Sequence, residues 1–310
     1  MSLALVFPGQ GSQSVGMLHA LAQDFPAVHA TFAEASAALG KDLWQLVEQG
    51  PVDALNQTDN TQPAMLAAGV AVWRIWCAQN GPRPAYMAGH SLGEYTALVC
   101  AGALDFSDAI KVVAERGRVM QEAVPAGTGA MAAILGLDDD AVKRVCAEAA
   151  HGEVLAAVNF NSPGQVVIAG HRAAVERGIE AAKVAGAKRA IILPVSVPSH
   201  CALMQSAGER MAVRLREIPV GTPTIPVLHN FSVQAETTPD AIRAALVAQL
   251  SGPVRWVETI QKMAQAGVDK IIECGPGGVL TGLNKRIVKG MNTYSVADKA
   301  GLEQALAAVR

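Results

Sequence analysis

Paired cysteines, a basic leader segment and long apolar runs are all missing from this sequence. Its five cysteines are scattered with no CxxC pair among them, so neither a disulfide framework nor a zinc site is indicated. Unpaired thiols suit a reducing compartment, and the cytoplasm is the expected location. The first residues carry no basic segment ahead of a cleavable apolar run, and no run is long enough to span a bilayer.

Charge is scarce as well. Only 17% of the 310 residues are charged, the net charge is -2, and 51% of the residues are hydrophobic. A chain of this length and composition is expected to fold around a large core. Because no dense basic stretch is present, neither nucleic acid nor an anionic membrane is an expected partner.

The stretch that carries the most chemical information is Gly89-His90-Ser91-Leu92-Gly93. A short apolar run precedes it and a helix-forming run follows. Strand, Gly-x-Ser-x-Gly and helix, in this order, are the context of a nucleophile elbow, whose turn is too tight for side chains beside the serine. The serine hydroxyl then stands at the start of a helix, where free N–H groups can stabilise an oxyanion. A Gly-Ser turn without chemistry is the alternative, but the flanking elements favour Ser91 as a nucleophile.

Two of the seven histidines are candidates for a general base. His200 follows Pro198-Ser199 in a predicted loop between a strand and a helix, and such a place suits a catalytic base. His229, which follows the apolar run 225–228, is the rival. The sequence favours His200 but leaves both open.

Three other features bear on a site. Arg116 lies at the edge of the apolar stripe of a helix predicted over 106–124, where an arginine often reaches water or pairs with a structural carboxylate. The turn Pro8-Gly9-Gln10-Gly11 lacks the third glycine of a dinucleotide fingerprint, and it can instead place a backbone N–H beside the serine. Residues 59–63 are predicted to form a turn, with Pro63 as the first residue of the next helix.

The order of the predicted elements divides the chain into two parts. Repeated β-then-α units in residues 1–125 and 197–310 indicate a parallel sheet with helices on both faces. Residues 126–196 between them follow the order βαββαβ of a ferredoxin-like unit, with a turn at 161–164. The expected fold class is therefore α/β: a large hydrolase-like domain with a parallel sheet and a nucleophile elbow, and a small ferredoxin-like domain inserted into it.

Seven stretches that run along nearly the whole chain are Phe7-Pro8-Gly9-Gln10-Gly11-Ser12-Gln13, Thr61-Gln62-Pro63-Ala64, Gly89-His90-Ser91-Leu92-Gly93-Glu94-Tyr95, Arg116, Asn159-x-Asn161-Ser162-Pro163-Gly164-Gln165, Pro198-Ser199-His200 and Glu273-x-Gly275-Pro276-Gly277. In this order they resemble one family, the malonyl-CoA:acyl carrier protein transacylases, and more broadly the acyltransferase domains of fatty acid and polyketide synthases. Each stretch is modest alone, and together they are specific.

The resemblance implies a catalytic set. Ser91 would be the nucleophile that becomes malonylated, and His200 its general base. The family has no triad acid, and by position the backbone carbonyl of Gln249 would orient the histidine. The N–H groups of Gln10 and Leu92 would form the oxyanion hole.

The resemblance also implies residues that bind the substrate. Arg116 would pair with the free carboxylate of the malonyl group in the two-point geometry that a guanidinium provides. Gln62, Asn161 and Ser199 would lie beside the bound acyl group. Polyketide acyltransferases that select malonyl often carry phenylalanine at the position of Ser199, and a serine leaves room for a larger acyl group.

The expected reaction is the transfer of a malonyl group from malonyl-CoA to the phosphopantetheine thiol of acyl carrier protein, in fatty acid biosynthesis. No bound cofactor or metal is expected. A malonate decarboxylase subunit, a polyketide acyltransferase, a serine hydrolase and a non-catalytic scaffold are the alternatives. The carrier protein of this pathway is acidic, so a local basic patch that binds it is expected. The candidate residues are Lys188, Arg189, Lys285, Arg286 and Lys289. The alternative is that these residues are ordinary surface charge.

Overall fold

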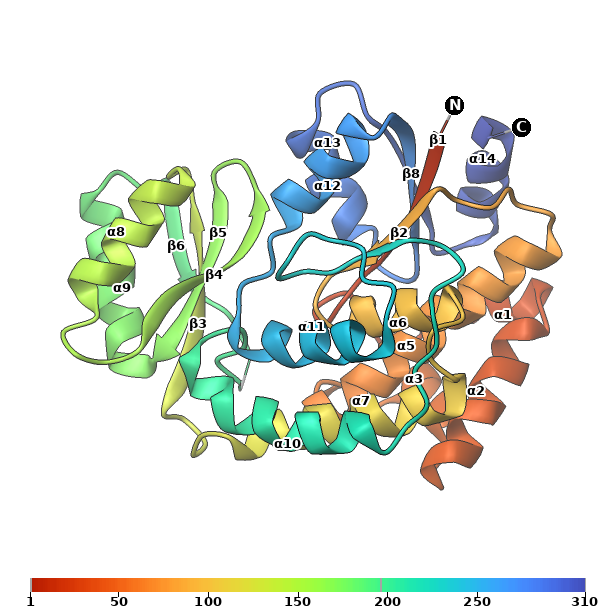
Figure 1. Cartoon of the computed structure of the whole chain (residues 1–310), viewed down its shortest axis with the longest axis horizontal. Helices are drawn as coiled ribbons and strands as arrows, with labels where there is room; N and C mark the ends of the chain where they lie inside the picture. Colours follow the sequence, from red (N-terminus) through yellow and green to blue (C-terminus); the bar gives the residue numbers. More distant parts are fainter. Residues whose placement is uncertain (1, 196, 310) are drawn as a thin grey trace.

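Two separate β-sheets organise the chain (Figure 1). The structure is a computed structural model that describes residues 2–195 and 197–309. The predicted domain limits at residues 1, 196 and 310 lie outside the described residues.

The larger sheet is parallel and has five strands. In order across the sheet they are β7 (Val227–Leu228), β2 (Tyr86–Gly89), β1 (Ser2–Phe7), β8 (Val268–Cys274) and β9 (Asn292–Val296). The central strand β1 alternates strictly, since Leu5 and Phe7 join the core on one face and Ala4 and Val6 join the core on the other. Both faces are therefore apolar and must be covered by helices.

Most helices share the core of Leu5 and Phe7. They are α1 (His19–Asp24), α2 (Ala27–Leu39), α3 (Leu43–Gln49), α4 (Val52–Leu55), α5 (Thr58–Ala78), α6 (Gly93–Cys100), α7 (Phe106–Glu122), α10 (Gln205–Arg216), α11 (Pro239–Ser251) and α14 (Lys299–Val309). A short 3₁₀ helix, Ala202–Met204, precedes α10. The opposite face packs against α12 (Trp256–Gln265) and α13 (Val279–Ile287).

The smaller sheet is antiparallel and has four strands. In order they are β4 (Leu155–Ser162), β5 (Gln165–His171), β3 (Gly129–Leu135) and β6 (Arg189–Ile192). Helices α8 (Asp139–Ala149) and α9 (Arg172–Val184) cover the face that points away from the parallel sheet (Figure 1). This is the strand order of a ferredoxin-like unit, so the predicted fold class is confirmed.

The predicted turn at 161–164 is too long. Asn161 and Ser162 continue strand β4, and only Pro163 and Gly164 form the turn. Gly164 has φ 72°, a conformation that glycine adopts without strain and that lets two residues reverse the chain.

The prediction that Pro63 begins a helix is wrong. Helix α5 begins at Thr58, and the predicted turn residues form its first turns. The proline removes one helical hydrogen bond. The gain from packing outweighs this loss, because Thr61, Gln62 and Pro63 are all buried in the described structure.

Strand register brings three loops together. Phe7 pairs with Gly89, and Val6 pairs with Glu273, so the central strands end at one edge of the sheet. In parallel α/β sheets this carboxyl edge is where sites form. In residues 2–195 and 197–309, no helix is both long enough and apolar enough to cross a membrane.

Candidate active site

The Gly-x-Ser-x-Gly stretch forms the sharp turn that its sequence predicts. A Cβ atom at Gly89 would overlap the backbone of Gly93, and one at Gly93 would overlap the carbonyl of Phe7. Only glycine fits at these two positions. Ser91 itself has φ 51°, in the left-handed region that a side chain makes costly.

Ser91 and His200 come together from positions 109 residues apart. The Oγ atom of Ser91 lies 2.8 Å from Nε2 of His200, and Nδ1 of the same ring lies 2.7 Å from the backbone oxygen of Gln249. A carbonyl can only accept, so Nδ1 carries the hydrogen and the lone pair of Nε2 faces the serine. This is the geometry of a general base oriented by a backbone carbonyl.

The electrostatic surroundings keep His200 neutral. The residue is 3% exposed, and burial, together with the nearby Arg116 cation, lowers the pKa of His200 to about 3. An imidazole with this pKa is unprotonated at neutral pH and can accept the proton of a hydroxyl group.

Arg116 lies inside the site rather than at the edge of a helix. It is 1% exposed, and Nη1 donates to Oε1 of Gln62 at 2.8 Å. Its Nη2 donates to Oε1 of Gln249 at 2.9 Å and to Oγ of Ser91 at 3.3 Å. The prediction of a position at the margin is therefore wrong, because side-chain carbonyls take the place of water around the guanidinium.

No carboxylate lies within ion-pair distance of Arg116 in the part of the chain that the structure describes, and the charge of Glu94 acts on it only from farther away. Its hydrogen-bond partners there are neutral oxygens, and its Nε–H has no acceptor among the described residues. Burial accordingly lowers the pKa of Arg116 from its ordinary value. A buried cation without a carboxylate in direct contact is costly and favours an anion bound beside it.

These groups line one cavity of about 120 Å³. Its lining residues are Gln10, Gln62, His90, Ser91, Leu92, Arg116, Met120, Met131, Asn159, Leu193, Val195, Val197, Ser199 and His200. The cavity lies between the two sheets, since Met131 comes from β3 while the elbow follows β2.

Two backbone N–H groups beside the serine are free. Gly93 and Glu94 donate their N–H groups to the carbonyls of His90 and Ser91. Among the hydrogen bonds of the described residues, none uses the N–H of Leu92 or of Gln10. Both residues line the cavity, so both N–H groups are available to a ligand.

Of the other predicted site residues, some line the cavity and one does not. Gln62 and Ser199 line the cavity, whereas Asn161 does not. Instead, Oδ1 of Asn161 lies 2.8 Å from Nε2 of His90, which joins the antiparallel sheet to the elbow. Asn159 lines the cavity in its place, and its buried Oδ1 has no hydrogen-bond partner in the described structure.

Sequence reasoning missed a buried polar group behind the elbow. Glu94 contacts His229, Asn230 and Gln249. His229, the rival base, therefore faces a carboxylate and not the serine. Glu94 belongs to the elbow motif, but its partners are at least 135 residues away in the sequence, and no local pattern connects them.

No group of three or more His, Cys, Asp or Glu side chains in residues 2–195 and 197–309 could hold a metal ion. All five cysteines are free thiols, and only Cys77 is exposed.

The parallel sheet, the elbow and the Ser–His pair define the class as serine-dependent α/β enzymes that act on acyl groups. Comparison with protein families narrows this class. The family described as "Acyl transferase domain" matches residues 4–306, and the chain belongs to it.

Individual relatives are similar over nearly their whole length. The chain is 59% identical over 303 residues to the malonyl CoA-acyl carrier protein transacylase of Escherichia coli K12, and the match covers 98% of each chain. It is 61% identical over 299 residues to the protein of that name from Haemophilus influenzae Rd, with 96% of each covered.

Solved structures agree. An acyl carrier protein S-malonyltransferase from Vibrio cholerae O1 superposes with a TM-score of 0.96 at 59% identity, covering 98% of this chain and 99% of that one. A malonyl-transacylase in complex with its type II PKS acyl-carrier protein superposes with a TM-score of 0.98 at 57% identity, covering 99% and 100%. The resemblance inferred from the motifs is confirmed.

Proposed function

We propose that this protein transfers a malonyl group from malonyl-CoA to the phosphopantetheine thiol of an acyl carrier protein, supplying fatty acid biosynthesis. The names of its relatives support this reaction. The observation that carries it is the buried cation of Arg116, 3.3 Å from the Ser91 hydroxyl. A malonyl thioester has a free carboxylate two carbons from the reacting carbonyl, and a guanidinium binds a carboxylate at two points.

The first half-reaction makes an acyl-enzyme at Ser91. Nε2 of His200 takes the hydroxyl proton as Oγ bonds to the thioester carbon. The N–H groups of Leu92 and Gln10 stabilise the tetrahedral oxyanion. When it collapses, the carbon–sulfur bond breaks and His200 returns the proton to the CoA sulfur.

The second half-reaction repeats these steps with another thiol. His200 takes the proton of the pantetheine thiol, the sulfur attacks the malonyl-serine ester, and the carbon–Oγ bond breaks. The proton then returns to Ser91. With the carbonyl of Gln249 in place of an acid, the imidazolium is less stabilised than in a Ser-His-Asp triad, which suits an acyl-enzyme that waits for a thiol.

We assign supporting roles to the remaining predicted residues. Gln62 fixes the orientation of Arg116 through its side-chain oxygen. Asn161 holds His90 at the cavity wall, and Ser199 bounds the space open to the acyl group. The proposed steps call on no cofactor or metal, and the free thiols fit the cytoplasm as the place of the reaction.

We also propose that residues 126–196 form a domain inserted into residues 1–125 and 197–310. The antiparallel sheet has its own core with α8 and α9, separate from the cores on the two faces of the parallel sheet. The active site would then lie between the two domains, a common place for a ligand site.

The basic residues near this site are proposed to receive the carrier. Nη2 of Arg286 donates to Oε1 of Gln165 at 2.7 Å, and Gln165 and Arg189 both pair with Leu135 on neighbouring strands. The segment with Lys188 and Arg189 and the segment with Lys285, Arg286 and Lys289 therefore flank one end of the antiparallel sheet. From Arg189 to Leu193, which lines the cavity, the chain runs four residues, about 13 Å in extended form.

The test is to mix the purified protein with malonyl-CoA and to read its intact mass. We expect a stable malonyl adduct on Ser91 that added holo-acyl carrier protein discharges, and no adduct with Ser91→Ala. Free malonate without an adduct would indicate a serine hydrolase. If only a polyketide carrier, or only the carrier of a malonate decarboxylase, discharges the malonyl adduct, the protein serves that pathway instead of fatty acid biosynthesis and the acyl-transfer chemistry still holds. The absence of both an adduct and free malonate would indicate a non-catalytic scaffold.

A further inference from the structure

Glu94 is a buried carboxylate that the proposed mechanism does not use. It lies in the first turn of α6 with 0% of its surface exposed. Oε1 lies 2.6 Å from Nδ1 of His229, and Oε2 accepts the backbone N–H of Asn230 and the Nε2–H of Gln249, each at 2.8 Å. A buried carboxylate needs several donors in place of water, and here all of them come from the distant segment 229–249.

Two of these partners hold the backbone of the elbow. Oδ1 of Asn230 accepts the N–H of Ser91 at 2.6 Å, and its Nδ2 donates to the carbonyl of Gly89 at 2.6 Å. Nε2 of Gln249 donates to the carbonyl of Ser91 at 3.0 Å. The nucleophile is therefore fixed at both its backbone groups by amide side chains, and Glu94 holds both of those residues.

This arrangement accounts for the strained conformation of Ser91. A non-glycine residue at φ 51° persists only where its surroundings hold it, and such strain gathers at functional sites. The same Gln249 also accepts from Arg116 through Oε1 and from His200 through its backbone oxygen. Glu94 is thus connected through a single intervening residue, Gln249, to the nucleophile Ser91, the base His200 and the cation of Arg116.

We infer that Glu94 is a positioning residue for acyl transfer, which sets the place of the Ser91 hydroxyl through Asn230 and Gln249. The inference rests on the proposed role of Ser91 as the nucleophile. Glu94 contacts neither the cavity nor the reacting atoms, so its effect is on geometry. A displaced nucleophile reacts slowly even when every reacting group is present.

The test uses two substitutions that differ in what they preserve. Glu94→Ala removes all three acceptor contacts. Glu94→Gln keeps a carbonyl oxygen for the two amide donors, while its NH₂ group can donate to His229 in the other ring tautomer. We expect the acylation rate constant of Ser91 to fall on the order of a hundredfold in Glu94→Ala, and to stay within about tenfold of wild type in Glu94→Gln.

Two readouts separate this inference from the proposed function. The first is the burst of acylation by malonyl-CoA, with the KM for malonyl-CoA expected to change little. The second is labelling of Ser91 by a fluorophosphonate, which needs an activated serine but no malonyl group. A slow labelling rate in Glu94→Ala supports the inference even if malonyl-CoA proves not to be the substrate.

Glu273 offers a matched control. It is equally buried, and its carboxylate accepts the N–H groups of Leu280 and Thr281 at the start of α13, away from the elbow. Glu273→Ala is expected to lower the thermal midpoint and to leave the labelling rate of the folded protein unchanged.

Three outcomes would overturn the inference: a folded Glu94→Ala that labels at the wild-type rate, a Glu94→Gln as slow as Glu94→Ala, or an equal loss in Glu273→Ala. If Glu94→Ala does not fold, the variant Asn230→Ala tests the inference in its place. It leaves the carboxylate in place and removes only the side-chain contacts to Ser91 and Gly89. Slow labelling in Asn230→Ala would support the inference, and a wild-type rate would refute it.

Discussion

Arg116 is the residue on which we expect selectivity to depend, because its cation is buried and no carboxylate among the described residues lies within ion-pair distance of it. We predict that Arg116→Ala lowers acylation of Ser91 by malonyl-CoA by about a hundredfold or more, since a buried charge pair is lost. Acylation by acetyl-CoA, which brings no carboxylate, should be unchanged or faster. Intact mass against time, with both acyl donors, measures this ratio.

Arg118, two residues further along α7, provides the control for that substitution. Its side chain is 50% exposed and pairs with Glu115 and Glu122 at the surface. Arg118→Ala should leave the malonyl-to-acetyl ratio as in the wild type. Equal losses with both donors in Arg116→Ala would show that the arginine supports the fold of the site and does not select the acyl group.

The protonation of His200 gives a second prediction. Burial is the larger cause of its low pKa, and the charge of Arg116 adds to it. The His200 ring should therefore show no titration between about pH 5 and 8, the range in which an ordinary histidine changes charge. Removing the cation with Arg116→Gln should raise the pKa of His200, which NMR of labelled histidine measures. Arg118→Gln should leave the pKa of His200 unchanged.

The same shift affects stability. Below pH 6.5, the ordinary value, the unfolded chain binds a proton at His200, while the folded protein does not until the pH approaches 3. Folding stability from this group is therefore fully present above pH 6.5 and decreases as the pH falls from there toward 3. His200→Gln should weaken this acid dependence in urea unfolding. An unchanged pH dependence would show that other groups dominate it.

Local chemistry could be read from the sequence, and long-range contacts could not. The elbow was predictable because the tight turn requires glycine at 89 by sterics against Gly93, and at 93 by close packing against the strand that ends at Phe7. The family resemblance supplied the partners of Ser91. Glu94 had no such signal, since its partners Asn230 and Gln249 lie 136 and 155 residues away in the sequence. Nor could periodicity show that Arg116 is buried, because its neutral partners come from α5 and α11.

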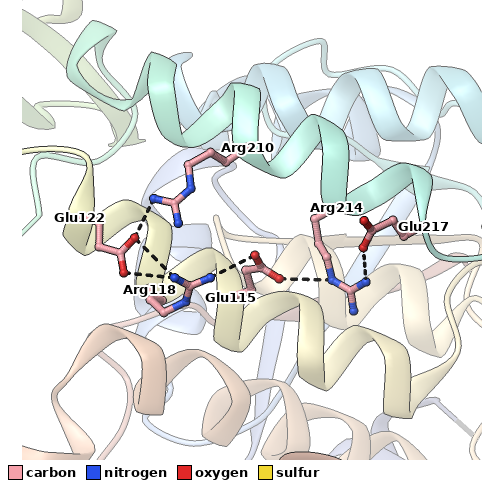
Figure 2. A network of polar contacts seen from close by, with 6 residues as sticks. All are labelled: Glu115, Arg118, Glu122, Arg210, Arg214 and Glu217. Atoms are coloured by element: carbon pink, nitrogen blue, oxygen red, sulfur yellow. Dashed lines mark hydrogen bonds and ion pairs between the residues drawn. The ribbon is translucent and has the colours of Figure 1, made fainter.

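At the scale of elements, helix α7 has a different role on each side. Its buried side carries Arg116, and its outer side is joined to α10 by a chain of ion pairs (Figure 2). The pairs link Glu122 to Arg118 and Arg210, and Glu115 to Arg118 and Arg214. All of these side chains are partly exposed to solvent.

We predict that this network contributes little to stability and nothing to selectivity. Exposed pairs are worth about 0–1 kcal/mol each and weaken in salt, whereas Met211 and Leu215 of α10 are fully buried. A double-mutant cycle with Glu115→Ala and Arg214→Ala, followed by urea unfolding, should give a coupling of about 1 kcal/mol or less. A loss of malonyl selectivity in either variant would instead mean that the network sets the position of Arg116.

The helix start wrongly predicted at Pro63 lies beside the site. Proline normally belongs in the first turn of a helix, so a start at Pro63 was the natural prediction. The observed start at Thr58 lets the first turn of α5 lie directly against Gly117 of α7, where a Cβ atom would meet the backbone of Asp59. This close approach brings Gln62 to Arg116. Local preference is overridden here by packing that serves the site.

At the scale of the whole molecule, the charges raise a question of recognition. The net charge is -2, yet the proposed partner is acidic. Overall charge cannot attract such a partner, so attraction must be local. Arg189 and Arg286 are exposed at the same end of the antiparallel sheet, and Arg189 is four residues from Leu193 of the cavity lining. We expect these two arginines to bind the phosphate at the base of a pantetheine arm whose thiol enters the site.

We predict that Arg189→Glu with Arg286→Glu raises the KM for the carrier on the order of tenfold at low salt, with the difference shrinking near 1 M salt. Lys41→Glu with Lys299→Glu is the matched control, since both lysines are exposed elsewhere and the change in net charge is the same. Transfer to free pantetheine, which has no phosphate, should not change in either double variant. If the control raises the carrier KM equally, recognition depends on total charge. If pantetheine transfer also falls in the arginine variant, those residues shape the catalytic cavity and do not dock the carrier.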